Sequence, residues 1–490
     1  MCLSKRNKFI FSSFILIIFI LFCVVYIQSY PAIIFNTDDW CFITFSRSIL
    51  PQWEANNPCR VLPECLMPAC SWLAATFIMP FNHDLVNSIA IITGLVIAVF
   101  LTAYFYFSVK MLMKRFNLSA TVALFLSLLF ILLHYLVFRK TQEVRMPLFA
   151  ANSLTHVYFY LLPDIANATL VLIYLAGICE VFHQKKYVKI AFLILVIYFA
   201  LFSNLYASIM LPVFVGSLLL VKIIFGEYRN GTVLSFIKKN LFELIILLVW
   251  AVVQFFEING GRSKYLSEGN DFSFEKIYSF SMRYASYLYH NINHIFLFAG
   301  GIAVIISVIV LIVRKKPETR QLFQLYISLA ISFIVSSIYI ILVCIKAHGT
   351  IEYHAIIFAP IFFWILIVFI SISILIKSFA PSKVLLPVIC LFIAFQINSD
   401  SKNFARFCQV PTGYAKALDD YIISSIVEAD NAGQEILVLD VPDFGGYDNF
   451  PLATYGGGYV ARALEKFNIT STKVYVEFHP NSELNERFHL

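Results

Sequence analysis

Two adjacent carboxylates, Asp38 and Asp39, follow directly after an apolar run at residues 9–29. Charged groups beside a membrane are costly unless they are solvated or used, so this pair needs an explanation. One carboxylate could take a proton from a hydroxyl nucleophile, and repulsion from its neighbour would raise its pKa and make it a better base. The alternatives are a metal ligand at the mouth of a membrane cavity, or a solvated helix end capped by Asp38. From the residues alone, a general base and these alternatives stay open.

The segment after the carboxylates carries groups that suit an anionic sugar ligand. Arg60 can hold two phosphate oxygens at once through its planar fork. Trp40 suits sugar stacking or anchoring at the membrane surface, and Glu64 is a further substrate-binding candidate. Prolines at positions 58, 63 and 68 are expected to break any helix here, which predicts an ordered loop. Five cysteines could pair in an oxidising compartment or remain free buried thiols: Cys41, Cys59, Cys65, Cys70 and Cys408.

Two other segments place cations where a lipid phosphate could bind. Arg145 and Glu143 belong to a short basic segment that we expect on the outer face, where an excess of basic residues is unusual. Binding of a lipid phosphate would explain it, and an ordinary headgroup contact is the alternative. Arg262 follows a pair of glycines whose backbone amides could approach a phosphate. A flexible turn is the alternative there.

A fourth polar segment contains Lys346, His348, Glu352 and His354. The two histidines and the glutamate could form a metal cluster, although no recognised zinc spacing is present. We favour hydrogen bonding to sugar or phosphate, with Lys346 and His348 supplying positive charge to a bound phosphate. A requirement for a divalent cation, Mg²⁺ or Mn²⁺, is left open.

The composition of the chain indicates a membrane protein. The 490 residues are 60% hydrophobic and only 13% charged, with a mean hydropathy of +0.81, whereas a soluble domain is about half apolar and about a quarter charged. In or beside the fourth expected span, Asp164 is a functional candidate because an intramembrane acid is costly, with a place at the membrane interface as the alternative. A lone His156 there is more often a packing residue. Apolar length and breaker residues predict about eleven membrane-spanning helices, at residues 9–29, 86–109, 118–138, 160–182, 189–203, 205–226, 240–258, 293–313, 322–345, 355–376 and 384–399.

The distribution of charge predicts the orientation in the membrane. With the N-terminus inside, the inner segments contain nineteen Lys and Arg but only two acids, which is the positive-inside pattern. An odd number of spans then places the C-terminus outside. The net charge of +7 therefore reflects the excess of Lys and Arg in the inner segments and does not indicate nucleic-acid binding.

The soluble mass is expected on the outer face, in loops 30–85 and 259–292 and in a tail at 400–490. The transmembrane domain would cover residues 1–399. In the tail, residues 412–432 have helical periodicity, and residues 436–439 and 473–478 indicate strands. We therefore expect a small α/β domain, with the glycines at 456–458 in a loop that is not a nucleotide fingerprint, because no Rossmann unit surrounds it.

An Asp-Asp-Trp motif just outside the first helix, followed by a second Trp and an Arg-x-x-Pro segment that starts at Arg60, resembles membrane glycosyltransferases with a C-type (GT-C) fold. More narrowly, the chain is similar to the bacterial and phage O-antigen glucosyltransferases that modify lipopolysaccharide and convert serotype. The basic N-terminus, the many spans and the outer α/β tail agree with that family's layout.

The resemblance implies a specific reaction at the periplasmic face of the bacterial inner membrane. The donor would be undecaprenyl-phosphate glucose or a related hexose, and the acceptor would be the O-antigen polysaccharide. The sugar would be transferred in one displacement with inversion, and Asp38 or Asp39 would be the base, with Asp39 slightly favoured.

Two other classes share part of this pattern. An O-antigen polymerase or ligase has similar spans, but it usually places its essential cations in large loops between later spans. A transporter of polyprenyl-linked sugars would need charged or broken helices at the midplane and repeats between its halves, whereas the ionisable residues here gather at the outer face. A nucleotide-sugar enzyme would need a cytosolic domain, and the longest inner segment covers only residues 222–239.

Overall fold

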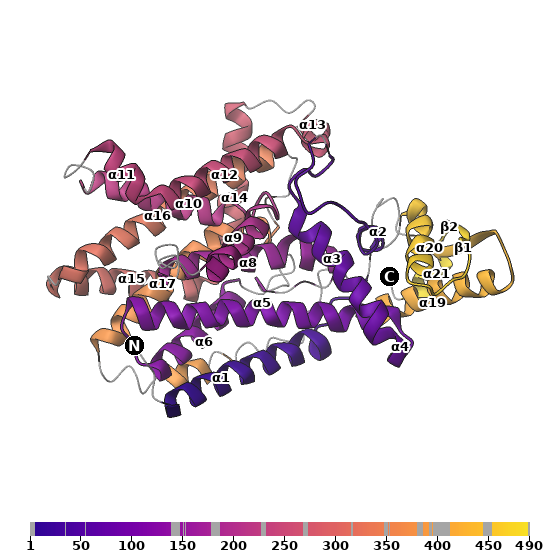
Figure 1. The fold of residues 1–490 in the computed structure, drawn as a ribbon, viewed down its shortest axis with the longest axis horizontal. Helices are drawn as coiled ribbons and strands as arrows, with labels where there is room; N and C mark the ends of the chain where they lie inside the picture. The colour runs from indigo at the N-terminus through magenta and orange to yellow at the C-terminus, as the bar shows by residue number, and fades with distance from the viewer. Residues whose placement is uncertain are drawn as a thin grey trace.

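A computed structural model gives the fold of the chain, which is mostly helical (Figure 1). The structure describes residues 5–34, 36–53, 55–138, 148–149, 151, 153–177, 187–226, 232–267, 273–314, 317–346, 351, 353–379, 386–391, 394, 412–443 and 453–488. Of the candidate site residues, Glu143, Arg145, His348 and Glu352 lie outside the described residues, as does Cys408.

Within the described residues, eight helical segments are long and apolar enough to cross a membrane, and three shorter apolar helices accompany them. This is the architecture of a polytopic helical membrane protein. The long segments are Phe9–Ser29, Val61–Asn82, Leu85–Arg115, Leu154–Leu175, Leu241–Asn259, His294–Val313, Thr319–Lys346 and Phe358–Ser378, and the shorter ones are Ala120–Leu136, Tyr187–Leu201 and Met210–Ile224.

The elements of the bundle follow one another closely along the chain. They are α1 (Lys5–Cys23), α2 (Thr37–Phe42), α3 (Val61–Leu73), α4 (Met79–Asn82), α5 (Leu85–Arg115), α6 (Ala120–Leu136), α7 (Leu154–His156), α8 (Leu162–Leu175), α9 (Tyr187–Leu201), α10 (Met210–Ile224), α11 (Val233–Lys239), α12 (Leu241–Ile258), α13 (Gly261–Ser267), α14 (Phe274–Asn291), α15 (His294–Arg314), α16 (Pro317–Lys346) and α17 (Phe358–Ser378). Each expected span before the last coincides with one of these helices. Only residues 386–391 and 394 of the expected span at 384–399 are described, and they are helical.

The first outer loop differs from the prediction, because residues 61–82 form an apolar helical segment and not an ordered loop. Contrary to the prediction, the prolines do not break a helix here. Pro63 stands in the first turn of α3, where its missing N–H costs nothing, and α3 continues through Pro68. The outer segment 259–292 is likewise largely helical, as α13 and α14.

Helix α5 is the central element of the bundle and packs against α1, α6 and α8. Its 31 residues would extend about 46 Å at roughly 1.5 Å per residue, beyond a hydrocarbon core about 30 Å thick. Figure 1 shows it running from the C-terminal domain to the end of the molecule that holds the N-terminus. Helices α8 and α17 are enclosed by their neighbours, whereas α1, α12 and α15 expose apolar side chains, as lipid-facing helices do.

The C-terminal domain is a small α/β unit, as the sequence predicts. It consists of α19 (Thr412–Asn431), β1 (Ile436–Pro442), α20 (Gly457–Lys466), β2 (Tyr475–Asn481) and α21 (Glu483–Arg487). The two strands pair in parallel, with Ile436 opposite Tyr475, so α20 is the crossover helix that a parallel pair requires.

The glycines expected in a loop instead begin α20, inside a β-α-β unit that the sequence did not reveal. A Cβ on Gly457 would lie 2.5 Å from the backbone oxygen of Val476, so the absence of a side chain lets the helix pack closely on β2. The same turn rests on α2, because a Cβ on Gly456 would lie 3.3 Å from Thr37 Oγ1.

The C-terminal domain docks on the elements that carry the Asp pair (Figure 1). Thr37 Oγ1 accepts a hydrogen bond from the backbone N–H of Ala453 at 2.7 Å. Lys466 Nζ donates to the backbone oxygen of Thr44 at 2.6 Å. An ion pair of 3.0 Å joins Lys416 of α19 to Asp84 at the start of α5. The tail therefore forms one wall around α2.

Candidate active site

The second of the two candidate carboxylates of α2, Asp39, has a structural role. Asn36 caps the helix: its side chain accepts from the Asp39 N–H at 2.8 Å, and Asp39 Oδ2 accepts from the Asn36 N–H at 3.4 Å. Asp39 Oδ1 also accepts from the backbone N–H and the hydroxyl of Thr155, at 2.6 and 2.5 Å. Asp39 is fully buried, with 0% of its surface exposed. It joins α2 to α7 and is not placed to meet a substrate, which corrects the preference for Asp39 as the base.

Asp38 has the opposite environment. Neighbouring positions on a helix point about 100° apart, and Asp38 is exposed to solvent where Asp39 is buried. Partial enclosure by the surrounding protein raises the pKa of Asp38 above its usual value, and the positive charges of Arg262 and Arg60 act against that rise. Asp38 is thus a carboxylate that water can reach and that faces two cations.

A buried ion-pair network lies next to Arg60, which is the N-cap residue of α3. Arg47 Nη1 lies 2.7 Å from Glu64 Oε2 and donates to the backbone oxygen of Asn57 at 2.9 Å. Asn57 Nδ2 donates to the other oxygen of Glu64 at 3.0 Å. Arg47 Nη2 donates to the Pro58 oxygen at 2.9 Å. Glu64 is buried, and its two oxygens accept from Arg47 and Asn57, so this residue holds the loop in place. This corrects the expectation that Glu64 binds substrate.

A backbone pairing between segments distant in sequence brings Arg262 to the loop that precedes Arg60. The N–H of Gly261 donates to Ala55 O and the N–H of Arg262 to Asn56 O, both at 3.0 Å. Gly260 is needed for this approach, because a Cβ there would lie 2.5 Å from Pro58 Cδ. The glycine pair therefore has a packing role. Neither the predicted phosphate-binding role nor the alternative of a flexible turn applies to it.

The two arginines lie close enough to repel each other. The charge of Arg60 is the main cause, ahead of burial, of a lowered pKa at Arg262. Within the described residues, neither guanidinium forms an ion pair with an acid. Both attract Asp38 at longer range, and Arg60 also attracts Glu64. Two like charges held together without such an ion pair favour binding of an anion, and arginine suits phosphate.

Aromatic rings and histidines surround these cations. The guanidinium of Arg60 lies 5.8 Å from the ring centre of Phe159, a cation–π contact. Tyr160 and Tyr206 lie near Arg262. The ring of Tyr353 links Tyr160 to two histidines. Its centre lies 5.7 Å from the ring centre of Tyr160, 5.3 Å from that of His156 and 4.8 Å from that of His354.

The structure thus brings Asp38, Arg60 and Arg262 together, and we call these three residues the Asp38 site. His354 lies beside it through Tyr353, and Lys346 ends α16. Trp40 is fully buried, with 0% exposed, so stacking on a sugar is not open to it, and that expectation is corrected. Asp164 is buried in α8 inside the bundle.

Sequence reasoning missed Arg47 and the two tyrosines. A signal for Arg47 existed: Glu64 falls in an apolar segment and needs a cation, and the loop offers only Arg47 and Arg60. Nothing comparable pointed to Tyr160 or Tyr206, which lie among apolar residues.

The described residues contain no group of three or more His, Cys, Asp or Glu side chains that could hold a metal ion. The cluster proposed from His348, Glu352 and His354 falls partly outside those residues. The thiols of Cys41, Cys59, Cys65 and Cys70 are free, which agrees with the unpaired alternative for these four.

Comparison with known protein families, with characterised proteins and with solved structures finds no match.

Proposed function

We propose that this protein is an inverting glycosyltransferase that transfers a glucosyl or related hexosyl residue from an undecaprenyl-phosphate-linked donor to O-antigen polysaccharide. The observation that supports it best is the Asp38 site: one solvent-accessible carboxylate in the field of two arginines, neither of which forms an ion pair within the described residues. A polyprenyl-phosphate sugar needs these two kinds of group, a base for the acceptor hydroxyl and cations for the phosphate.

The reaction follows from the roles of the three side chains. Asp38 takes the proton of the acceptor hydroxyl as the oxygen attacks the anomeric carbon. The bond between that carbon and the phosphate oxygen breaks, and polyprenyl phosphate leaves. The negative charge that grows on the phosphate is stabilised by Arg60 and Arg262, through charge-assisted hydrogen bonds.

The proposed setting is the inner membrane of a bacterium, with the N-terminus in the cytoplasm and the C-terminal domain in the periplasm. The excess of Lys and Arg in the segments expected inside supports this orientation. A GT-C-like organisation is part of the same proposal. The docking of the tail on α2 supports a role for the tail in shaping the acceptor side of the site.

The test separates the two carboxylates. Membranes containing wild type, Asp38→Asn or Asp39→Asn are supplied with undecaprenyl-phosphate glucose and O-antigen acceptor, and both sugar transfer and protein level are measured. We expect Asp38→Asn to lower transfer by about 10²–10⁴-fold, the usual contribution of a general base, at an unchanged protein level. Asp39→Asn should mainly lower the protein level, because the amide keeps one acceptor oxygen and cannot accept from both Thr155 and the Asn36 N–H.

Full activity in Asp38→Asn would remove this residue from catalysis. An inactive wild type, with both substrates present and the protein at normal level, would shift weight to the polymerase, ligase or transporter alternatives.

A further inference from the structure

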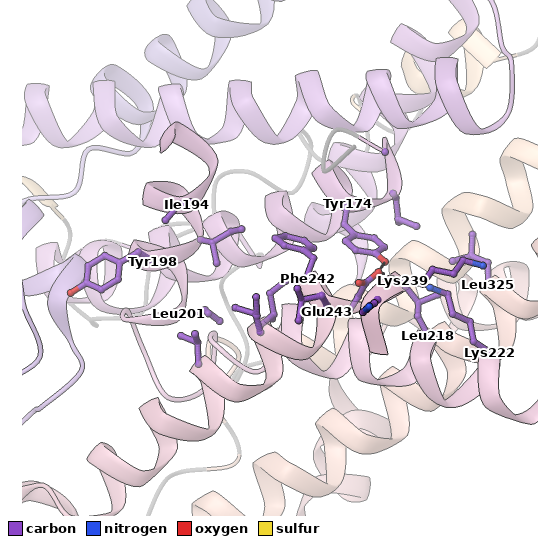
Figure 2. A pocket seen from close by; sticks show the side chains of 18 of the residues that line it. Tyr174, Ile194, Tyr198, Leu201, Leu218, Lys222, Lys239, Phe242, Glu243 and Leu325 are labelled. Atoms are coloured by element: carbon purple, nitrogen blue, oxygen red, sulfur yellow. Dashed lines mark hydrogen bonds and ion pairs between the residues drawn. The ribbon is translucent and has the colours of Figure 1, made fainter. Parts of the chain in front are cut away.

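A cavity of about 790 Å³ is lined mainly by residues of α8, α9, α10, α11 and α12 (Figure 2). Its lining changes character from one end to the other. Tyr174, Lys222, Lys239 and Glu243 gather at one end, and Ile194 and Leu201 lie toward the other. Such a cavity suits a molecule with one polar end and one apolar end.

The polar end carries a clear excess of positive charge. Four cations, Arg115, Lys222, Lys238 and Lys239, line it with a single acid, Glu243. That acid is already used: its Oε1 accepts from Tyr174 OH at 2.5 Å and lies 3.9 Å from Lys222 Nζ.

Within the described residues, Lys238 and Lys239 form no ion pair, and both are exposed at the C-terminal end of α11. Lys222 donates to Asn240 Oδ1 at 2.7 Å, which fixes α10 against the start of α12. The two α11 lysines are therefore the cations available to a ligand, and an anion of the phosphate type would neutralise them.

The apolar part of the cavity opens toward the lipid-facing surface of the bundle. Ile194, Leu241 and Ile245 line it and are 55%, 53% and 48% exposed. Deeper along the same wall lie Ile197, Leu201 and Val249. A hydrocarbon chain could enter from the side without leaving an apolar environment, which a soluble anion would have no reason to do.

We propose that this cavity binds an anionic phospholipid, with its headgroup phosphate at Lys238 and Lys239 and part of an acyl chain along the wall of Ile194 and Leu201. Figure 1 places α11 at the end of the bundle opposite the C-terminal domain, so the bound lipid belongs to the leaflet away from the Asp38 site. The cavity is within the usual range of about 300–1,000 Å³ for ligand pockets. It holds the headgroup and one chain segment, while the remaining chain stays in the bilayer. This inference does not rest on the proposed sugar transfer.

The test measures thermal unfolding of the full-length protein in detergent, with added dioleoylphosphatidylglycerol, dioleoylphosphatidylcholine or glycerol 3-phosphate. A ligand that binds the folded state raises the unfolding temperature. We expect the anionic lipid alone to raise it. The Lys238→Gln/Lys239→Gln double variant should lose at least half of that rise, while Lys189→Gln, which removes a cation from α9 outside the cavity lining, should keep it.

A second pair of variants tests the apolar part. Ile194 and Leu195 are adjacent on α9 and similarly exposed, but only Ile194 lines the cavity. Ile194→Trp should weaken the response to the lipid, and Leu195→Trp should leave it unchanged. An equal rise with the zwitterionic lipid, a full rise in the double lysine variant, or a full rise with glycerol 3-phosphate would each overturn the proposal.

Discussion

The Asp pair shows that two identical side chains at consecutive positions of a helix can have opposite environments. Asp39 closes a capping box and accepts two hydrogen bonds from Thr155, so its carboxylate holds α2 to α7. Asp38, one position earlier, is left open to water and to the field of Arg60 and Arg262. A base needs access to its substrate and a pKa above that of an ordinary carboxylate, and only Asp38 has both.

The electrostatics of Asp38 predict a pH dependence. The base acts in its ionised form, and its pKa is raised by burial, so transfer should fall on acidification at a pH above the ordinary range of an Asp carboxyl. Arg60 lowers that pKa, so Arg60→Gln should raise it and move the acid limb of the pH–rate profile to higher pH, besides weakening donor binding. The measurement is the rate of transfer against pH.

Lys264→Gln is the matched control, because this cation lies on α13 but is not among the charges that act on Asp38. An acid limb that stays in place in Arg60→Gln would show that a group other than Asp38 controls it.

At the scale of elements, the pairing of residues 55–56 with 261–262 decides where Arg262 lies. Gly260→Ala should disturb it, because the added Cβ would meet Pro58 Cδ at 2.5 Å and push the two segments apart. Overpacking of this kind costs about 1–3 kcal/mol. We expect a lower unfolding temperature and a larger fall in sugar transfer, since Arg262 moves away from Arg60.

Gly301→Ala gives the comparison, because a Cβ at Gly301 of α15 meets nothing within 4 Å. Equal behaviour of the two variants would mean that the close approach of Gly260 to Pro58 does not position Arg262.

The elements also show what the sequence could and could not predict. Apolar runs located the spans well, because hydrocarbon forces helix wherever about 20 apolar residues follow one another. The helix at 61–82 was missed because prolines were counted as breakers without regard to their position in the first turn. The β-α-β connection of the tail depends on strand pairing across some 40 residues, which no local pattern records.

The same limit applies to the site. Residue type alone picked out Asp38, Arg60 and Arg262 as candidates. That Arg262 meets Arg60 depends on a backbone pairing between segments about 200 residues apart. That Asp38 and not Asp39 is open depends on which side of α2 faces α7. Both facts belong to the tertiary structure.

At the scale of the whole molecule, a buried acid lies where the tail meets the membrane domain. Asp419 of α19 is buried, and burial, followed by the charges of Asp39 and Asp420, raises its pKa well above the usual value. Trp40 and Lys416 act in the other direction. The folded protein thus holds this proton more tightly than the unfolded chain does.

The sign of the pH effect follows from that difference. Stability should fall as the pH rises from the ordinary Asp pKa through the raised one, because the folded state must then give up its proton or bury a charge. Asp419→Asn removes this penalty, so the variant should unfold at a higher temperature than wild type at neutral pH and at a similar temperature near pH 4. Thermal unfolding of the full chain in detergent, measured across that pH range, checks it.

Asp420→Asn is the control, because Asp420 is half exposed and pairs with Lys416 at 2.6 Å. Loss of such a surface pair changes stability by about 0–1 kcal/mol. A gain in Asp420→Asn as large as that in Asp419→Asn would contradict a specific role for the buried acid.

The docking of the tail on α2 also sets an order of assembly. Thr37 and Thr44 leave the ribosome early, yet their partners Ala453 and Lys466 follow 416 and 422 residues later. Contacts so distant in sequence form last, after the helices between them are inserted. One wall of the Asp38 site is therefore missing from every incomplete chain, and a nascent or prematurely terminated product would lack it. The first loop therefore meets its partners in the C-terminal domain only after residues 453–466 have been made.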